Sequence, residues 1–455
     1  MHPATIRRLD AWLGRPMCLA LTTARRAGTL LGRSRHRRHE PPASARVPVR
    51  KILVLKLIEQ GATVLAYRAI ERAVAMVGRE NVYFLVFERN RAILDLLDLI
   101  PPANVLAVRD DGPVRFARDV LEALWRVRRL RIDAAIDMEF FARASAVLAF
   151  LSGARRRVGL HRFTAEGPYR GDLFTHRVQY SPYLHTAVAY YLLVEALRAD
   201  PSQTPLLKVS PPNLDWTPPP FRPGPGEVEE VNAILAAAAG RRVDGPMVLL
   251  NPNASDLLPL RRWPTERFVE LGRQLLRDHP ELTVVITGGP DERQAGEVVA
   301  RAINDQEVAG NDNDPRAVCL AGRTTLRQLL ALYTAAAVLV TNDSGPGHFA
   351  TLSDIDAIVL FGPETPALFG PLGSRVRTIT AGLACSPCVN AFNHRFSPCT
   401  DNACMRAIGV AEVVDAVGEA LAGRRTGRLS LTVLGSRMDR ALGRHADVVR
   451  AAVSG

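Results

Sequence analysis

The sequence predicts an α/β protein with two parallel-sheet domains that face each other across a central cleft. Short apolar runs of strand character alternate with amphipathic helical segments in two series, which begin at Arg50 and at Met247. Such alternation is typical of βα units, whose strands form a doubly wound parallel sheet. Residues 201–225, between the series, contain nine prolines and suit a stiff interdomain connection. At 455 residues, 47% of them hydrophobic, the chain can fill two cores.

The first series predicts an N-terminal Rossmann-like domain over residues 48–205. Its strands are expected where apolar residues run continuously, at residues 50–58, 82–87, 104–108 and 132–138. Its helices are expected where apolar residues recur at helical spacing, at residues 62–78, 90–99, 113–130 and 141–152.

The second series predicts a Pro-rich linker over residues 206–240 and a C-terminal Rossmann-like domain over residues 241–425. Expected strands of this domain are residues 247–251, 282–287, 337–341 and 356–361, and expected helices include residues 264–278 and 325–334. Residues 426–455 alternate basic and apolar side chains and are expected to form a helical tail that docks on the body.

The formal charge of +12 is concentrated at the N-terminus. Residues 1–50 hold 11 arginines against Asp10 and Glu40, so this segment carries a net +9 and the rest of the chain only +3. A nucleic-acid-binding protein needs basic residues clustered on its folded domains. The distribution therefore argues against a nucleic-acid partner and favours a membrane surface.

Residues 1–47 are predicted to be a basic tail, either amphipathic or disordered. Ile6, Leu9, Leu13 and Met17 recur at helical spacing with arginines between them. No apolar run approaches the roughly 20 residues that a spanning helix needs, and no clean apolar core precedes a cleavage site. An in-plane helix backed by arginines would hold the protein reversibly against anionic lipid. A disordered tail and an organelle transit peptide remain as alternatives.

Residues 337–350 carry the strongest functional signal. An apolar run ends abruptly in Asn342-Asp343-Ser344-Gly345-Pro346-Gly347-His348 and resumes as a helix. The first turn of a helix has unpaired N–H groups and partial positive charge, so this turn is a natural seat for a diphosphate. The glycines admit a bulky ligand, Ser344 can cap the helix or bind phosphate, and His348 lies one turn in, where a diphosphate would favour its protonated or hydrogen-bonding form. The alternative is an ordinary capped turn, with Asp343 as the cap.

Two other predicted strands end in similar loops. The run at residues 356–361 ends in Gly362-Pro-Glu364, and the run at residues 247–251 is followed by Asn253 and then by Arg261 and Arg262. Because ligands of parallel α/β sheets sit beyond the carboxyl ends of the strands, these loops should border one crevice. Arg262 is the candidate for a phosphate clamp; the alternative is a solvated charge pair before a helix.

Five segments in register resemble glycosyltransferase family 9, the ADP-heptose:lipopolysaccharide heptosyltransferases and their relatives. They are Asn251-Pro-Asn-Ala, Arg262-Trp-Pro-Thr-Glu-Arg-Phe, Thr287-Gly-Gly-Pro-Asp-Glu, Asn342-Asp-Ser-Gly-Pro-Gly-His and Phe361-Gly-Pro-Glu-Thr-Pro. The likeness is strong over residues 245–380, weaker over residues 50–200 and absent from the first 45 residues.

The resemblance implies a GT-B fold and inverting transfer of a sugar, plausibly a heptose, from a nucleotide-diphosphate donor such as ADP-heptose. It implies no cofactor or metal for catalysis, a glycolipid or glycan acceptor of the lipopolysaccharide type, and a cytoplasmic enzyme peripheral to the inner face of the cytoplasmic membrane. The donor would bind the C-terminal half, at Asn253, Arg262, Asn342, Asp343, Ser344, Gly345, Pro346, Gly347, His348, Gly362 and Glu364.

The sequence departs from the family at the expected catalytic base. Family members carry Gly-Asp in the loop after the first strand, whereas this chain has Gly61 followed by Ala62. Alanine cannot take a proton, so another carboxylate at the cleft is expected to serve. The candidates are Glu59, Asp137 and Glu139, each of which is alternatively a loop carboxylate or a helix cap. If none serves, the chain is either an altered transferase or a catalytically inert donor-binding or scaffold protein. An epimerase or phosphorylase of the same layout is a further alternative.

Four of the six cysteines lie within residues 385–404, a segment that we call the Cys loop. They are Cys385, Cys388, Cys399 and Cys404, and paired cysteines of this kind suit a tetrahedral, structural zinc site. Two disulfides, disfavoured in a reducing cytoplasm, and a packed group of reduced thiols are the alternatives. By the family resemblance the loop faces the acceptor, and it is expected to shape substrate entry.

Overall fold

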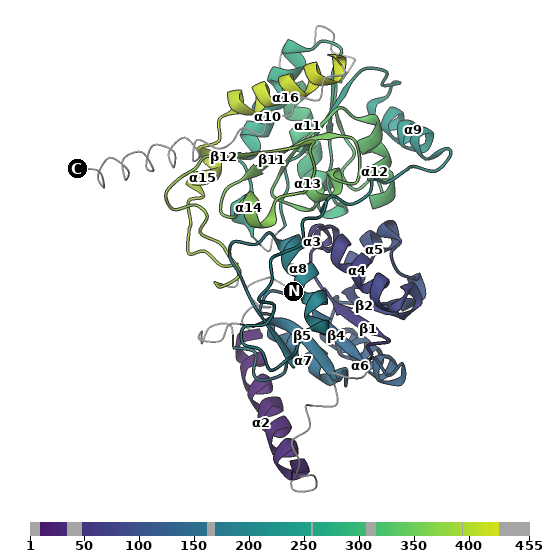
Figure 1. Ribbon diagram of the computed structural model, residues 1–455. Helices are drawn as coiled ribbons and strands as arrows, with labels where there is room; N and C mark the ends of the chain where they lie inside the picture. Colours follow the sequence, from purple (N-terminus) through teal and green to yellow (C-terminus); the bar gives the residue numbers. More distant parts are fainter. Residues whose placement is uncertain are drawn as a thin grey trace, which may run out of the picture.

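The structure is a computed structural model that describes residues 10–33, 48–161, 169–255, 258–305, 315–393 and 395–426. Two α/β domains stack on one another, joined by an extended connection (Figure 1). Each domain contains one six-stranded parallel sheet. The predicted fold class, two doubly wound parallel sheets, is confirmed.

The N-terminal sheet has the strand order β3-β2-β1-β4-β5-β6. Its strands are β1 (Ile52–Leu55), β2 (Val82–Phe87), β3 (Val105–Val108), β4 (Ala134–Asp137), β5 (Arg156–His161) and β6 (His176–Gln179). The order reverses between β1 and β4, which pair directly in parallel. Ligands of open α/β sheets bind at this switch point, beyond the carboxyl ends of the strands.

Helices cover both faces of the N-terminal sheet because successive strand residues point to opposite sides. Ile52 and Val54 face one cluster with α4 (Tyr67–Val77) and α8 (Thr186–Glu195). Leu53 and Leu55 face the other cluster, which is covered by three helices: α2 (Gly14–Arg33), α6 (Pro113–Arg129) and α7 (Arg143–Leu151). The short helices α3 (Gln60–Leu65) and α5 (Arg91–Leu97) lie at the edge that faces the second domain (Figure 1).

The C-terminal sheet repeats the plan with the order β12-β11-β10-β7-β8-β9. Its strands are β7 (Met247–Asn251), β8 (Thr283–Ile286), β9 (Ala317–Cys319), β10 (Val338–Asn342), β11 (Asp356–Phe361) and β12 (Val376–Thr380). One face is covered by α10 (Thr265–Asp278), α11 (Arg293–Asn304) and α16 (Val410–Thr426). The other is covered by α9 (Glu227–Ala239), α12 (Leu326–Ala335) and α13 (Gly345–Ala350). The short helices α14 (Pro366–Phe369) and α15 (Ala403–Arg406) follow β11 and the Cys loop.

The connection between the domains is shorter than the predicted linker over residues 206–240. Residues 199–226 form no helix or strand and are tied to both domains: the Arg68 side chain of the N-terminal domain donates to the Asp215 carbonyl, and Phe221 N–H donates to the Leu352 carbonyl of the C-terminal domain. Helix α9 then packs Val231 and Leu235 into the C-terminal core. Residues 227–240, two fifths of the predicted linker, therefore belong to the C-terminal domain.

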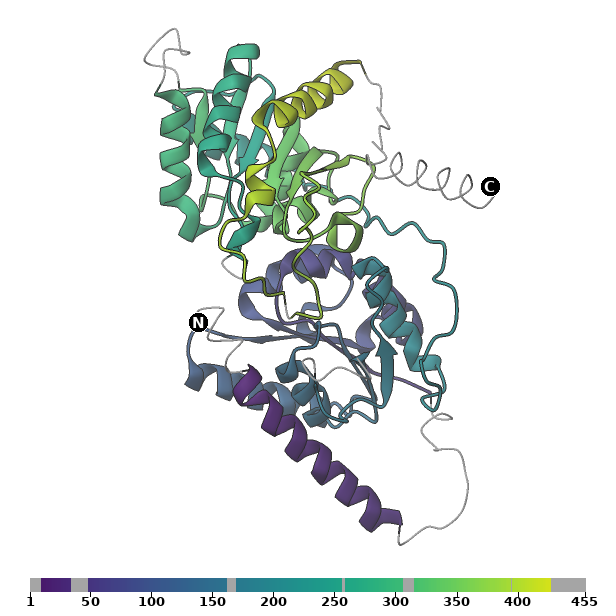
Figure 2. The ribbon, with the colours of Figure 1, turned by 90° about the vertical axis from the view of Figure 1, so that its left-hand side faces the viewer.

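Within the predicted tail, helix α2 is docked on the N-terminal domain (Figure 2). Cys18 is buried, the Thr22 hydroxyl accepts from the Asp172 N–H, and Arg25 pairs with the Asp172 carboxylate. Of the four apolar residues that predicted an amphipathic helix, Leu13 and Met17 are exposed, and Ile6 and Leu9 lie outside the described residues. None of the described helices is long and apolar enough to cross a bilayer. The predicted C-terminal helical tail lies beyond the described residues after Thr426.

Trp263 locks the start of α10 to the chain entering α16, and its replacement should destabilise the C-terminal domain. The side chain is buried, its indole N–H donates to the Ile408 carbonyl at 3.1 Å, and its ring meets Phe268 edge-on at 4.9 Å. We expect Trp263→Ala to cost about 3–5 kcal/mol through the cavity that it leaves. Urea unfolding followed by circular dichroism would measure the loss. Trp125→Ala removes an exposed indole and should change stability by less than about 0.5 kcal/mol; equal losses would contradict this account.

Candidate active site

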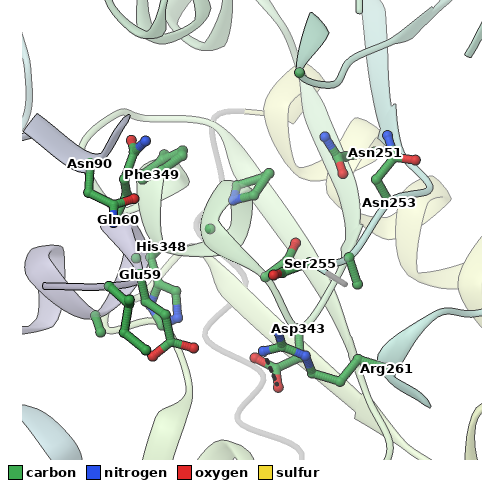
Figure 3. A pocket seen from close by; sticks show the side chains of 18 of the residues that line it. Glu59, Gln60, Asn90, Asn251, Asn253, Ser255, Arg261, Asp343, His348 and Phe349 are labelled. Atoms are coloured by element: carbon green, nitrogen blue, oxygen red, sulfur yellow. Dashed lines mark ion pairs between the residues drawn. The ribbon is translucent and has the colours of Figure 1, made fainter. Parts of the chain in front are cut away.

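A cleft of about 1000 Å³ lies between the domains, at the carboxyl ends of both sheets. The N-terminal wall comes from the loop after β1, from α3 and α8, and from residues after β2 and β4. The C-terminal wall comes from the loops after β7, β8, β10 and β11. Figure 3 shows side chains from the two walls directed toward the same space.

The turn between β10 and α13 forms one wall of the cleft. Asp343, Ser344, Gly345, Pro346 and His348 all line it. Asn342 does not, because its fully buried amide holds the turn in place: Oδ1 accepts from Trp263 N–H at 3.0 Å, and Nδ2 donates to the Pro252 carbonyl at 2.9 Å. This predicted ligand residue is thus a structural link between two cleft loops.

Arg261, and not the predicted Arg262, lies in the cleft. Pro259–Arg261 forms a 3₁₀ turn that directs Arg261 inward, where it is buried with its guanidinium 3.7 Å from the Asp343 carboxylate and 3.5 Å from that of Glu364 (Figure 3). The next residue is extended, so Arg262 points outward, is exposed, and donates to the Ala254 carbonyl. The arginine predicted as the clamp, Arg262, therefore does not line the cleft, and its neighbour Arg261 does.

A second guanidinium, that of Arg395 in the Cys loop, bridges the two walls. Its Nε and one terminal nitrogen donate to the two Glu364 oxygens at 2.8 and 3.0 Å, and the other terminal nitrogen donates to Glu59 of the N-terminal domain. Burial alone would raise the pKa of Glu59, but Arg395, with Lys56 and Arg261 farther away, outweighs it and lowers the pKa to about 2. Glu59 is therefore a carboxylate in this state.

Asp343 and Glu364 form a coupled acidic pair beneath Arg261. Burial raises the pKa of Asp343 well above its ordinary value; the Arg261 charge opposes this rise and Glu364 reinforces it. The two arginines outweigh burial at Glu364 and lower its pKa. Two like charges this close do not both ionise readily, so Asp343 carries the proton and Glu364 the charge.

His348 is neutral in this structure. Its side chain is buried against Gly61, at which a Cβ would approach the imidazole Cδ2 to 2.5 Å. Burial lowers the pKa of His348 to about 3, and His185 and Arg261 add to the effect. The expectation that a diphosphate favours the protonated or hydrogen-bonding form of His348 stays a prediction. Its Nδ1 has no hydrogen-bond partner among the residues that the structure describes.

Asp137 and Glu139, two of the three predicted bases, are buried supports that do not line the cleft. Asp137 pairs with Arg170 and accepts from the Ser145 hydroxyl at 3.0 Å, and burial raises its pKa. Glu139 pairs with Lys56 at 3.3 Å and accepts from the N–H groups of Leu57 and Ile58. Glu139 thus fixes the loop that presents Glu59, which is the candidate that reaches the cleft.

The remaining predicted ligands divide in the same way. Asn253 and Glu364 line the cleft, whereas Gly347 packs against Val359 and Pro371, and Gly362 packs against Met405 and Cys404. Sequence reasoning missed several cleft residues as site candidates: Arg261, Arg395, Tyr190, Phe140 and Thr186. Arg261 and Arg395 could have been found from the sequence, because each is a charged residue in a loop beside one of the motifs. The other three, which lie in the N-terminal domain, gave no such signal.

The Cys loop binds the domains together. Ala391 is buried in the N-terminal core, and Phe392 stacks on Phe141 at 6.1 Å and meets Tyr180 edge-on at 4.9 Å. The loop is anchored in its own domain where Cys388 and Val389 N–H groups donate to the Pro363 carbonyl. It is in this way that Arg395 reaches Glu59.

The geometry does not support the predicted structural zinc site. The four cysteines of the Cys loop are free thiols: Cys385 and Cys399 are exposed, Cys388 is partly buried, and Cys404 is buried. The Cys388 thiol donates to the Ser397 hydroxyl at 3.2 Å, and the Cys399 sulfur accepts from the Asn402 N–H. Across the described parts of the chain, no three His, Cys, Asp or Glu side chains are grouped to hold a metal ion.

Two Rossmann-like domains with a polar cleft at their facing strand ends define the GT-B class of fold. The family description "Glycosyltransferase family 9 (heptosyltransferase)" matches residues 122–395, and the chain belongs to this family. The family predicted from the five segments is thus confirmed.

Solved structures share the fold over most of the chain. The ADP-heptose LPS heptosyltransferase II of Escherichia coli superimposes with a TM-score of 0.59 and 20% identity, over 82% of this chain and 99% of that one. The family 9 glycosyl transferase of Veillonella parvula gives 0.59 and 18%, over 82% and 98%.

Curated relatives are similar over a shorter stretch. Lipopolysaccharide heptosyltransferase 2 of Salmonella typhimurium is 34% identical over 134 residues, which is 30% of this chain and 36% of the relative. The Escherichia coli enzyme of the same name gives the same values. The chain thus matches little more than a third of the length of these relatives.

The pair between Glu59 and Arg395 should contribute an acid-labile part of stability. Because the pKa of Glu59 is about 2 when folded against an ordinary 4.5, its contribution is complete above about pH 4.5 and is lost as the pH falls toward 2. Glu59→Gln should therefore flatten this decline by at most about 3 kcal/mol. Urea unfolding at stepped pH would measure it. Gln60→Ala, a neighbouring change without a titrating group, should follow the wild type; a Glu59→Gln curve parallel to the wild type would refute the assignment.

Proposed function

We propose that this protein transfers a heptosyl group from ADP-heptose to a glycolipid acceptor of the lipopolysaccharide type. The observation that carries the proposal is a set of buried polar atoms on the C-terminal wall of the cleft that find no hydrogen-bond partner within the described parts of the chain: Asn253 Nδ2, Arg261 Nε, Asp343 Oδ2 and His348 Nδ1. A buried polar atom costs free energy unless it is hydrogen-bonded. Four such atoms around one cleft therefore indicate a binding site for a polar ligand. Family membership supports a nucleotide sugar as that ligand.

The donor diphosphate is proposed to lie between Arg261 and the turn at Ser344. Arg261 provides paired donors suited to phosphate oxygens. Pro346 has no N–H and the Gly347 N–H donates to the Ser344 carbonyl, so the Gly345 N–H is the donor that the first turn of α13 would add. Asn253 and the neutral His348 would donate or accept at the sugar hydroxyls. Tyr190 lies on the N-terminal wall, where the acceptor would bind, and its buried hydroxyl has no hydrogen-bond partner in the portion of the chain that the structure describes.

In the proposed reaction an acceptor hydroxyl attacks the anomeric carbon from the face opposite the diphosphate. The carbon–oxygen bond to the diphosphate breaks, ADP leaves with the electron pair, and the hydroxyl proton passes to the Glu59 carboxylate. Arg261 would neutralise the charge that develops on the leaving group, the task that a metal ion performs in other transferases. Configuration at the anomeric carbon is inverted.

Glu59 needs a partner change to act as a base. A carboxylate with a pKa of about 2 binds protons weakly, and Arg395 is the cause. A bound diphosphate would compete with Glu59 and Glu364 for the guanidinium groups. As Arg395 shifts toward phosphate, the proton affinity of Glu59 would rise, so the base is active only with a donor in place.

The acceptor is proposed to be membrane-bound and the enzyme to work at the cytoplasmic face of the inner membrane. Helix α2 contains four arginines and no acidic residue, and it exposes Met17 and Leu19 while its other side docks on the domain. Such a helix favours reversible binding to anionic lipid.

The decisive experiment incubates the full chain with ADP-heptose and a lipopolysaccharide core glycolipid that lacks heptose. We expect ADP release together with a mass gain of one heptosyl unit on the glycolipid, and no transfer from UDP-glucose as the control. ADP binding without any ADP release would support the inert donor-binding alternative. Conversion of the free sugar nucleotide without acceptor would support an epimerase or a phosphorylase.

Arg261 and Arg262 form a matched pair for testing the donor site. Arg261→Met should lower kcat/KM by about 10²–10³, because one buried cation at the leaving group is lost. Arg262→Met changes the same residue type one position later, outside the cleft, and should stay within a few-fold of wild type. Steady-state ADP release would measure both, with thermal unfolding to check folding. Equal effects would contradict the inward placement of Arg261.

A further inference from the structure

Helix α6 carries a second apolar stripe that the N-terminal core does not use. Its inner face, with Ala123 and Val127, is buried against the sheet. On the opposite side Val114, Leu121 and Trp125 are 80%, 67% and 60% exposed. At 100° per residue these three side chains fall within about 20° of one line along the helix. We call this set the α6 stripe.

Exposed apolar side chains are concentrated on this part of the molecule. Of the 14 large apolar residues exposed among the described parts of the chain, eight lie on α6 or between Trp12 and Leu19. Helices α6, α7 and α2 cover the same face of the N-terminal sheet, since all three contribute to one core cluster. Figure 2 shows α2 running alongside this layer, on the side away from the C-terminal domain. A cluster of this kind marks an interaction surface.

Arginines flank the α6 stripe and indicate an anionic partner. The helix contains five arginines against two acidic residues, and one of the two, Asp119, is buried and held by Arg109. By helical position Arg118 and Arg129 border the stripe on one side and Arg128 on the other. The Arg129 guanidinium lies 4.9 Å from the centre of the Trp125 ring. Tryptophan and leucine between arginines are what an in-plane helix presents to an anionic bilayer.

We propose that the α6 stripe is a membrane-docking surface, which joins α2 in seating the N-terminal domain on an anionic lipid bilayer. The inference rests on the proposed membrane association but assigns it to the folded domain as well as to the N-terminal helix. Trp125 and Leu121 would enter the headgroup region and the flanking arginines would contact lipid phosphates. Two amphipathic helices of one layer, α6 and α2, would fix the orientation of the domain on the membrane, which one helix alone does not.

The test measures binding of the full chain to vesicles containing phosphatidylglycerol. The double variant Leu121→Ser/Trp125→Ser should lower the partition onto these vesicles about tenfold or more, since two apolar side chains no longer leave water. Binding of the wild type should also weaken with added salt and be slight on phosphatidylcholine alone. Val298→Ser, on an exposed position of α11 in the other domain, is the matched control and should bind as wild type.

A second measurement keeps the proposal falsifiable if the double variant folds poorly. Trp125→Phe preserves an apolar ring, so it should retain most of the binding. Brominated lipid should quench the tryptophan fluorescence of the wild type, and the quenched part should be the part that Trp125→Phe lacks. An unquenched Trp125, or full vesicle binding by a folded double variant, would overturn the proposal. If Leu13→Ser/Leu19→Ser alone abolishes binding, membrane association stands and the α6 stripe does not share in it. If the double variant instead abolishes self-association of a wild type that ignores vesicles, the stripe is an interface between copies.

Discussion

The ion pairs of Arg395 hold the two domains in one arrangement and give the cleft its chemistry. This guanidinium meets Glu364 of its own domain and Glu59 of the other, and Phe392 three residues earlier is stacked in the N-terminal aromatic cluster. The packing of Phe392 holds the domains together, and the ion pairs of Arg395 fix their relative position. They do so because a buried charge is tolerated only with a well-placed partner. A cleft between independent domains would otherwise have no fixed width.

The same ion pairs set the protonation of the whole cleft. With the proton on Asp343, the two carboxylates of Glu59 and Glu364 balance the two guanidinium groups of Arg261 and Arg395. These four charges of the cleft therefore sum to zero. An anionic ligand enters this balance as a competitor for arginine, and its charge would be offset only as far as Glu59 or Glu364 takes up a proton from solvent.

The sequence was informative where a single local pattern determines the structure. Central strands are fully buried and read as continuous apolar runs, so β1, β2, β7, β10 and β11 could be located in advance. The strands β5 (RRVGLH), β6 (HRVQ), β9 and β12 (VRTIT) are short or carry polar residues, and their patterns gave no comparable signal.

Side-chain direction could not be predicted in irregular segments. Arg261 and Arg262 are adjacent and chemically identical, and only a 3₁₀ turn decides which of them enters the cleft. Asp137 and Glu139 lie at the end of a strand, just as a catalytic carboxylate would. Each forms an ion pair with a buried cation that is remote from it in sequence, Arg170 for Asp137 and Lys56 for Glu139. The Cys loop binds the two domains together because Phe392 reaches the N-terminal domain, which no local pattern predicts. Its cysteines suggested a zinc site instead.

Backbone strain marks the same pair of residues from an independent direction. Glu59 and Arg395 both have left-handed backbone conformations, with φ of 69° and 56°. Residues other than glycine rarely adopt this conformation. Such strain persists only where surrounding contacts hold the backbone in place. Glu139 accepts from the backbone just before Glu59, and hydrogen bonds of Asn390 and Asn393 close the turn before Arg395. Two strained residues that meet across a domain boundary are a costly arrangement for stability alone. The cost is understandable if the position of the Glu59 carboxylate in the cleft is what the structure maintains, in a chain that has Ala62 where its family has an aspartate.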